Sequence, residues 1–164
     1  MKRRIMAMFP EEFRDNPVHF QALGLAFVYV TMALLQLFTF ESFVEVTLNY
    51  GLPGGRVTAV AIAFLIPITE VMALPYLLSM RLPRRIYIIS RASVLATATL
   101  WFLIALWTNT SGNNDGSLGI FGATLDTPNQ WWSVVFIGFV VWAAWLIYSA
   151  KPIRHRVTSA RKAS

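Results

Sequence analysis

Cysteine is absent from the chain and histidine is nearly so: of 164 residues, none is cysteine and two are histidine. Without thiols the chain can form no disulfide bond, give no thiolate to a metal ion and carry out no thiol–disulfide exchange. His19 and His155 lie far apart in the sequence, whereas a zinc site needs several histidine or cysteine ligands together. We therefore expect no metal centre.

Charged residues are also scarce. They make up 13% of the chain, against about 25% in a soluble domain. The apolar residues form runs that are long enough for membrane-spanning helices, each of which needs roughly 20 residues. The sequence therefore predicts an all-α polytopic membrane protein, a four-transmembrane-helix bundle in a single membrane domain over 1–164. The four apolar blocks lie at about 18–39, 57–80, 86–108 and 131–150.

The few charges are unevenly distributed, with a net charge of +6. Lysine and arginine gather in the tails, 1–17 and 151–164, and between the second and third blocks. The two remaining loops, 40–56 and 109–130, carry the acidic residues of the connections. Because lysine and arginine concentrate on the cytoplasmic side of membrane proteins, both termini are expected inside and these two loops outside. The pattern favours contacts of the tails with lipid head groups rather than with nucleic acid.

Glu70 is the most conspicuous polar residue of the apolar blocks. It follows Pro67 by three residues, and an ionisable group at such depth usually faces the bundle interior and is a functional candidate. Arg91 in the third block is its natural partner, since their depths differ by roughly 6 Å at a rise of 1.5 Å per residue. Two interpretations stay open. Glu70 pairs with Arg91, or bonds to a carbonyl freed near Pro67, as a structural element; or Glu70 binds a quinone, a proton or a substrate group.

A second polar group is expected where the first two blocks meet the outer face. These residues form either an ordinary solvated helix end or a polar functional site. The candidate members of this outer polar cluster are Gln36, Glu41, Glu45, Tyr50 and Arg56.

The second outer loop contains an unusual apolar stretch, Gly119, Ile120, Phe121 and Gly122, shortly before the fourth block. Glycine permits positive φ angles and close backbone approach. Ile120 and Phe121 can then fold back on the outer ends of the helices, and we expect this loop to be a rigid lid or a docking surface. Asp126 or Thr127 would cap the following helix.

These features together resemble the DoxX-like and MauE-like membrane proteins. The run GLAFVYVTMALLQLFTFESFVEVTLNYGLPGG is similar to their first helix, short helix and Tyr-Gly turn, with Gln36 where they have lysine. Their second-helix glutamate is matched by Glu70. MauE-like proteins commonly carry Cys-Gly-Cys-Phe-Gly before the fourth helix, and this motif falls on 118–122, where aliphatic residues replace both cysteines.

The resemblance implies a bacterial inner-membrane protein related to factors that mature periplasmic redox enzymes, but disulfide chemistry needs a thiolate that this chain lacks. We therefore expect no catalytic residue, and a non-catalytic subunit or assembly factor of a larger redox or photosynthetic membrane complex. Other membrane subunits would be its partners. A quinone-linked oxidoreductase component using Glu70 or Arg91 is an alternative, with quinone as its cofactor. A transporter of protons or small solutes is a further one.

Overall fold

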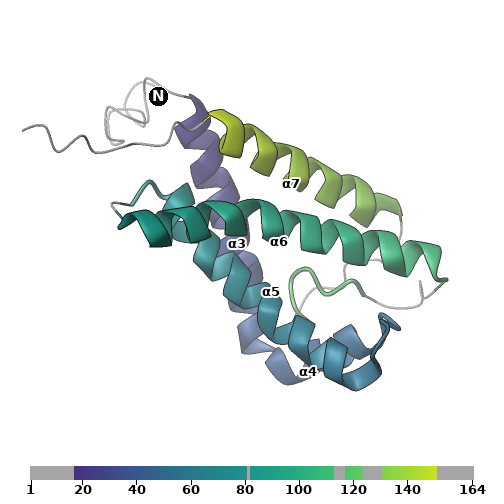
Figure 1. Ribbon diagram of the computed structural model, residues 1–164. Helices are drawn as coiled ribbons and strands as arrows, with labels where there is room; N and C mark the ends of the chain where they lie inside the picture. Colours follow the sequence, from purple (N-terminus) through teal and green to yellow (C-terminus); the bar gives the residue numbers. More distant parts are fainter. Residues whose placement is uncertain (1–16, 81, 113–116, 124–130, 151–164) are drawn as a thin grey trace, which may run out of the picture.

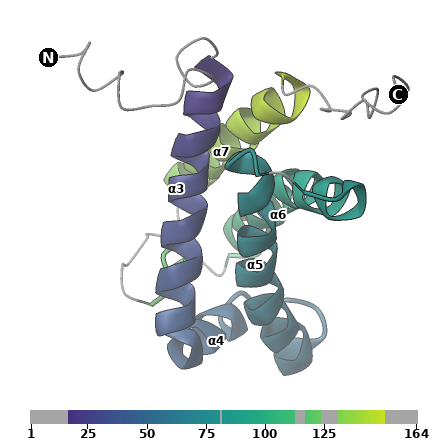
Figure 2. The same cartoon turned by 90° about the vertical axis from the view of Figure 1, so that its left-hand side faces the viewer.

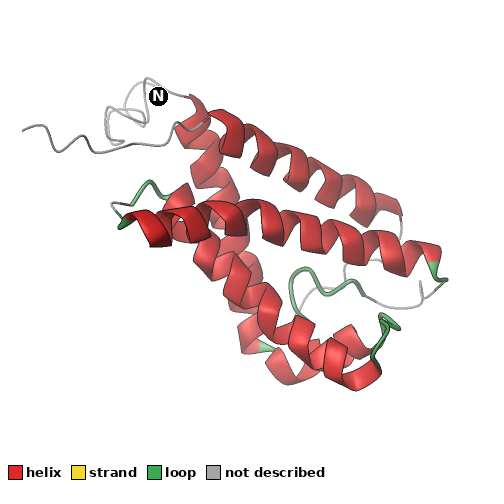
Figure 3. Ribbon diagram, in the orientation of Figure 1, coloured by secondary structure: helices red, strands yellow, loops and turns green. Residues whose placement is uncertain are grey.

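A computed structural model describes residues 17–80, 82–112, 117–123 and 131–150. All regular elements in these segments are helices (Figure 3). They are α3 (Pro17–Phe38), α4 (Phe40–Leu48), α5 (Gly55–Leu77), α6 (Arg84–Thr110) and α7 (Trp131–Ala150). Four of them, all except α4, are long and apolar enough to cross a membrane. The predicted class, an all-α membrane protein with four spanning helices, is confirmed.

The helix α4 lies inside the segment that we expected to be the first outer loop. Its two faces differ: Phe43 and Thr47 are fully buried, while Glu41 and Glu45 are exposed. Residues four apart share a helix face, so each pair marks one side of an amphipathic helix. The helix is too short to span a bilayer, and it lies across one end of the bundle (Figure 2).

The spanning helices form two pairs that cross. In Figure 1, α6 and α7 run side by side, and Figure 2 shows α3 beside α5. The helix α5 also packs on α6 and α4, and α3 contacts α7. We call the end where α3 begins and α7 ends the tail end, and the opposite end, with α4 and residues 117–123, the loop end.

Two prolines interrupt the backbone bonding of α5, and a serine of α6 compensates for one of them. Pro67 and Pro75 lie inside the helix, where each lacks a backbone N–H donor. Next to the second, the N–H of Tyr76 donates to Ser90 Oγ at 2.9 Å. In lipid, backbone groups that lose their helical partner need one from a neighbouring helix. The serine therefore joins α5 and α6 near the tail end.

Candidate functional site

Glu70 lies at the centre of a polar group inside the bundle. Its side chain is fully buried, and Oε1 accepts hydrogen bonds from Trp101 Nε1 at 2.9 Å and from Gln36 Nε2 at 3.3 Å. These three residues, which we call the buried hub, come from α5, α6 and α3. A single carboxylate oxygen thus connects three spanning helices.

The second outer loop is attached to the same hub. Gln36 Nε2 also donates to the carbonyl oxygen of Ile120 at 2.9 Å. Farther along, Tyr50 Oη donates to the carbonyl of Leu118 at 2.6 Å, and the N–H of Ala123 donates to Thr39 Oγ1 at 3.1 Å. The side chains of Leu118 and Ile120 are 0% and 2% exposed. The loop is therefore a buried part of the core.

Two glycines allow this loop to fit. Gly119 and Gly122 have φ angles of +62° and +65°, a region that side chains other than glycine rarely adopt. A Cβ atom at Gly122 would lie 2.6 Å from the carbonyl oxygen of Leu35, and one at Gly119 would lie 2.8 Å from Val46. Glycine is needed at both positions because the loop backbone lies against α3 and α4.

The interpretation of Glu70 and Arg91 as a pair is wrong. Arg91 Nη2 donates instead to the carbonyl of Tyr148 at 3.1 Å, and its guanidinium lies 3.9 Å from the centre of the Tyr148 ring. The neighbouring Ser90 is level with Tyr76, six residues beyond Glu70. That separation is about 9 Å along a helix. Nor does Glu70 bond to a carbonyl near Pro67 within the described residues, since both donors to it are side chains.

The predicted outer polar cluster separates into buried and exposed members. Gln36 and Tyr50 are buried, whereas Glu41, Glu45 and Arg56 are exposed. Burial raises the pKa of the Tyr50 hydroxyl, so this group stays neutral and donates to the loop. The structure therefore assigns Gln36 and Tyr50 to the loop contacts rather than to a shared site with the three charged residues.

Sequence reasoning missed Trp101. A tryptophan in the middle of an apolar block carries an indole N–H that needs a partner when buried, and Glu70 was the available acceptor. The hub as a whole offers one buried carboxyl group held by two fixed donors. In the described segments, no three histidine, aspartate or glutamate side chains are grouped so as to hold a metal ion. The predicted caps of α7, Asp126 and Thr127, lie outside the described residues.

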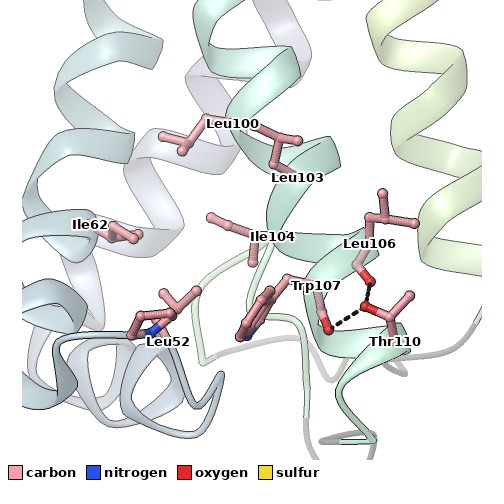
Figure 4. A pocket seen from close by; sticks show the side chains of 9 residues that line it. Leu52, Ile62, Leu100, Leu103, Ile104, Leu106, Trp107 and Thr110 are labelled. Carbon is pink, nitrogen blue, oxygen red and sulfur yellow. Dashed lines mark hydrogen bonds between the residues drawn. The ribbon is translucent and has the colours of Figure 1, made fainter.

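A separate apolar groove of about 400 Å³ lies between α6, the first part of α5 and the residues just before α5 (Figure 4). Trp107 stands at its loop end and donates from Nε1 to the carbonyl of Tyr50 at 3.2 Å. Neither Glu70 nor Arg91 lines it. Its walls are formed by Leu52, Pro53, Ile62, Leu100, Leu103, Ile104, Leu106, Trp107 and Thr110.

The comparisons with known proteins identify the family. A search of curated proteins and a search of solved structures found no match. The model of one family, described as methylamine utilisation protein MauE, matches residues 14–149. This match covers most of the 164 residues and includes all four spanning helices, the hub and the loop. The chain therefore belongs to the MauE family of membrane proteins.

Proposed function

We propose that the protein is a non-catalytic integral membrane subunit or assembly factor of a larger redox or photosynthetic membrane complex. The observation that supports this most is the use made of its interior polar groups. Gln36 and Tyr50 hold the loop, and Glu70 holds Gln36 and Trp101. The two motif positions that would carry thiols are Leu118 and Ile120, both buried. These interior groups hold the helices and the loop in a fixed arrangement. The function then depends on which partner binds the surface of that arrangement.

The loop end is the surface that we propose for docking. Exposed carboxylates of α4 lie there together with tryptophans at the start of α7, Trp131 and Trp132, which are 63% and 76% exposed. Tryptophan is common both at membrane interfaces and in protein interfaces. The distribution of lysine and arginine supports a cytoplasmic tail end. The docking surface would then face outward, on the side opposite the basic tails.

Gentle isolation of the full chain tests this proposal. A tagged copy is expressed at its natural level, the membrane is solubilised in a mild detergent, and co-purifying subunits are quantified by mass spectrometry. We expect a defined set of membrane subunits at a constant molar ratio to the chain. Deleting the gene should reduce the amount or activity of that same complex, and re-expression should restore it. A chain that purifies alone, together with unchanged complexes after deletion, would refute the accessory role.

A quinone-linked component is the alternative, and the apolar groove favours it. Its volume and aliphatic walls suit the ring and tail of a quinone, as ligand pockets are mostly apolar. The protein purified from native membranes would then contain quinone in a fixed ratio. Leu103→Trp, which fills the groove, should abolish this content, and Glu70→Gln tests whether the hub contributes. Absence of quinone from the purified wild-type protein would exclude this alternative.

A further inference from the structure

Arg91 lies inside the membrane-spanning part of α6 and has no acidic partner among the described residues. It lies seven residues after Arg84, the first residue of the helix, or about 10 Å along the axis. Its guanidinium contacts the carbonyl and the ring of Tyr148 and the hydroxyl of Tyr76, and no carboxylate of the described residues. A cation at this depth is costly unless it is paired or reaches the interface. The side chain therefore needs an explanation beyond packing.

One donor of Arg91 has a structural role. The carbonyl of Tyr148 would normally accept from the backbone nitrogen of residue 152. That residue is proline, which has no N–H to donate. Arg91 Nη2 supplies the missing bond at 3.1 Å, and its positive charge suits the last turn of α7, where the helix dipole is negative.

The remaining N–H donors of Arg91 have no such role at the end of α7. A guanidinium carries five N–H donors, and the buried Nε has no acceptor among the described residues. The ring of Tyr148, 3.9 Å from the guanidinium carbon, fixes the plane of the group. Tyr76 supports the same region by donating to the carbonyl of Ile147 at 3.4 Å. The guanidinium is thus oriented before any ligand binds.

A second positive charge lies on the same helix face. Residues seven apart on a helix point in nearly the same direction, so Arg84 and Arg91 form a stripe along α6, with Tyr87 between them. Arg84 is exposed, and the ring of Tyr87 packs edge-on against Tyr76 at 5.5 Å. The stripe begins at the first residue of a helix that is long and apolar enough to cross a membrane, and it reaches the end of α7 at Tyr148.

We propose that Arg91 and Arg84 bind the phosphate group of an anionic phospholipid at the tail end of the bundle. The planar guanidinium matches phosphate oxygens with two parallel hydrogen bonds. Anionic lipids are attracted to basic residues beside membrane helices. Free phosphate offers the same chemistry, so the test separates the two sources. The lipid is favoured because Arg84 is exposed and Arg91 is partly exposed within a helix that is long and apolar enough to cross a membrane.

The experiment uses the full chain in neutral detergent with added phosphatidylglycerol, phosphatidylcholine or inorganic phosphate. We measure thermal unfolding, and we count retained lipids by native mass spectrometry. Phosphatidylglycerol should raise the unfolding temperature of the wild-type protein and remain bound, whereas phosphatidylcholine should not. Arg91→Gln should weaken the apparent affinity about tenfold to a hundredfold, as expected when a hydrogen bond to a charged group is lost. Arg84→Gln should weaken it less.

Arg56→Gln is the matched control, because it removes an exposed arginine at the loop end and changes the net charge equally. It should bind phosphatidylglycerol like the wild type. Equal losses in Arg56→Gln and Arg91→Gln, or no loss in Arg91→Gln, would refute the site. Equal responses to both lipids with a response to inorganic phosphate would refute the lipid as its ligand.

If Arg91→Gln does not fold, lipid binding is measured instead with Arg91→Lys and with Arg84→Gln, which changes an exposed residue. Lysine keeps the charge but lacks the planar fork, so intermediate binding is expected. Unchanged binding in both variants would overturn the proposal.

Discussion

Glu70 and Arg91 both lie inside spanning helices, yet their surroundings differ in kind. Glu70 is fully buried and accepts hydrogen bonds from Gln36 of α3 and Trp101 of α6. Gln36 also donates to the loop carbonyl of Ile120. Arg91 is partly exposed and, among the described residues, meets the carbonyl and the ring of Tyr148 and the hydroxyl of Tyr76. An ionisable residue in a membrane is a functional candidate by default. The comparison shows that the connections of each residue, rather than its depth alone, indicate what it does.

Substitutions in the buried hub and in the arginine stripe (Arg84 and Arg91) should also differ in their effects. A hub residue joins several elements, so its loss should reach the loop and the helices together. Arg91 joins α6 to the end of α7 and has donors left over. We therefore expect variants of the hub and loop to change stability strongly. Variants of exposed residues should change binding while leaving stability nearly constant.

The largest effect is expected for Gly122→Ala. The added Cβ would lie 2.6 Å from the carbonyl oxygen of Leu35, at a φ of +65°. Backbone strain of this kind and overpacking each cost about 1–3 kcal/mol, so a loss of about 3 kcal/mol is expected. The measurement is reversible unfolding in mixed micelles. Gly138→Ala is the control, because that glycine is helical and its Cβ would meet the nearest atom at an ordinary 3.8 Å. Similar losses in both variants would show that the loop is not tightly packed.

Glu70→Leu should have the next largest effect. It leaves the N–H groups of Trp101 and Gln36 without their acceptor, and unpaired buried donors cost about 1–3 kcal/mol each. Hydrogen bonds between membrane helices are often weaker, about 0.6 kcal/mol on average, so we expect about 2 kcal/mol in total. Glu70→Gln keeps an acceptor oxygen and should lose less than about 1 kcal/mol. Hydrogen exchange of loop residues 118–122 should increase in the leucine variant first. Equal losses in the two variants would mean that the acceptor oxygen of Glu70 is not what holds the hub together.

The hub and the stripe also show how far the sequence alone could lead. The four spanning helices were predictable because long apolar runs have few other stable structures. The glycines and apolar residues of the loop led us to expect a rigid lid or a docking surface, and the structure places Leu118 and Ile120 of this loop in the core. The pairing of Glu70 with Arg91 failed because it rested on depth along straight helices, whereas the spanning helices cross as two pairs. Gln36 was expected in a polar cluster at the outer face, and in the structure it is buried and donates to the carbonyl of Ile120 at the loop end. Trp101 could have been found by asking which buried donor needs an acceptor.

Tyr50→Phe should have a smaller effect that depends on pH. It removes the hydrogen bond to the carbonyl of Leu118 and should cost about 1 kcal/mol near pH 8. Burial raises the pKa of Tyr50 in the folded protein, while an unfolded tyrosine has a pKa of about 10. As pH rises above this value, the unfolded chain releases its proton first, so the wild type loses stability. The difference between wild type and variant should therefore narrow in alkaline solution. A difference that stays constant to about pH 11 would argue against a buried, neutral Tyr50.

The smallest effect on stability is expected for the exposed face of α4, where binding should change instead. Glu41 and Glu45 are exposed, and surface substitutions usually change stability by less than about 0.5 kcal/mol. If the loop end docks on a partner with a basic surface, E41K/E45K should reduce the amount of co-purified complex strongly. The neutral pair E41Q/E45Q should reduce it partly, because charge complementarity changes in graded steps. Unfolding curves of both variants should coincide with that of the wild type. Unchanged co-purification in both would move the docking surface away from α4 and leave the tryptophans at the start of α7 as the residues to test.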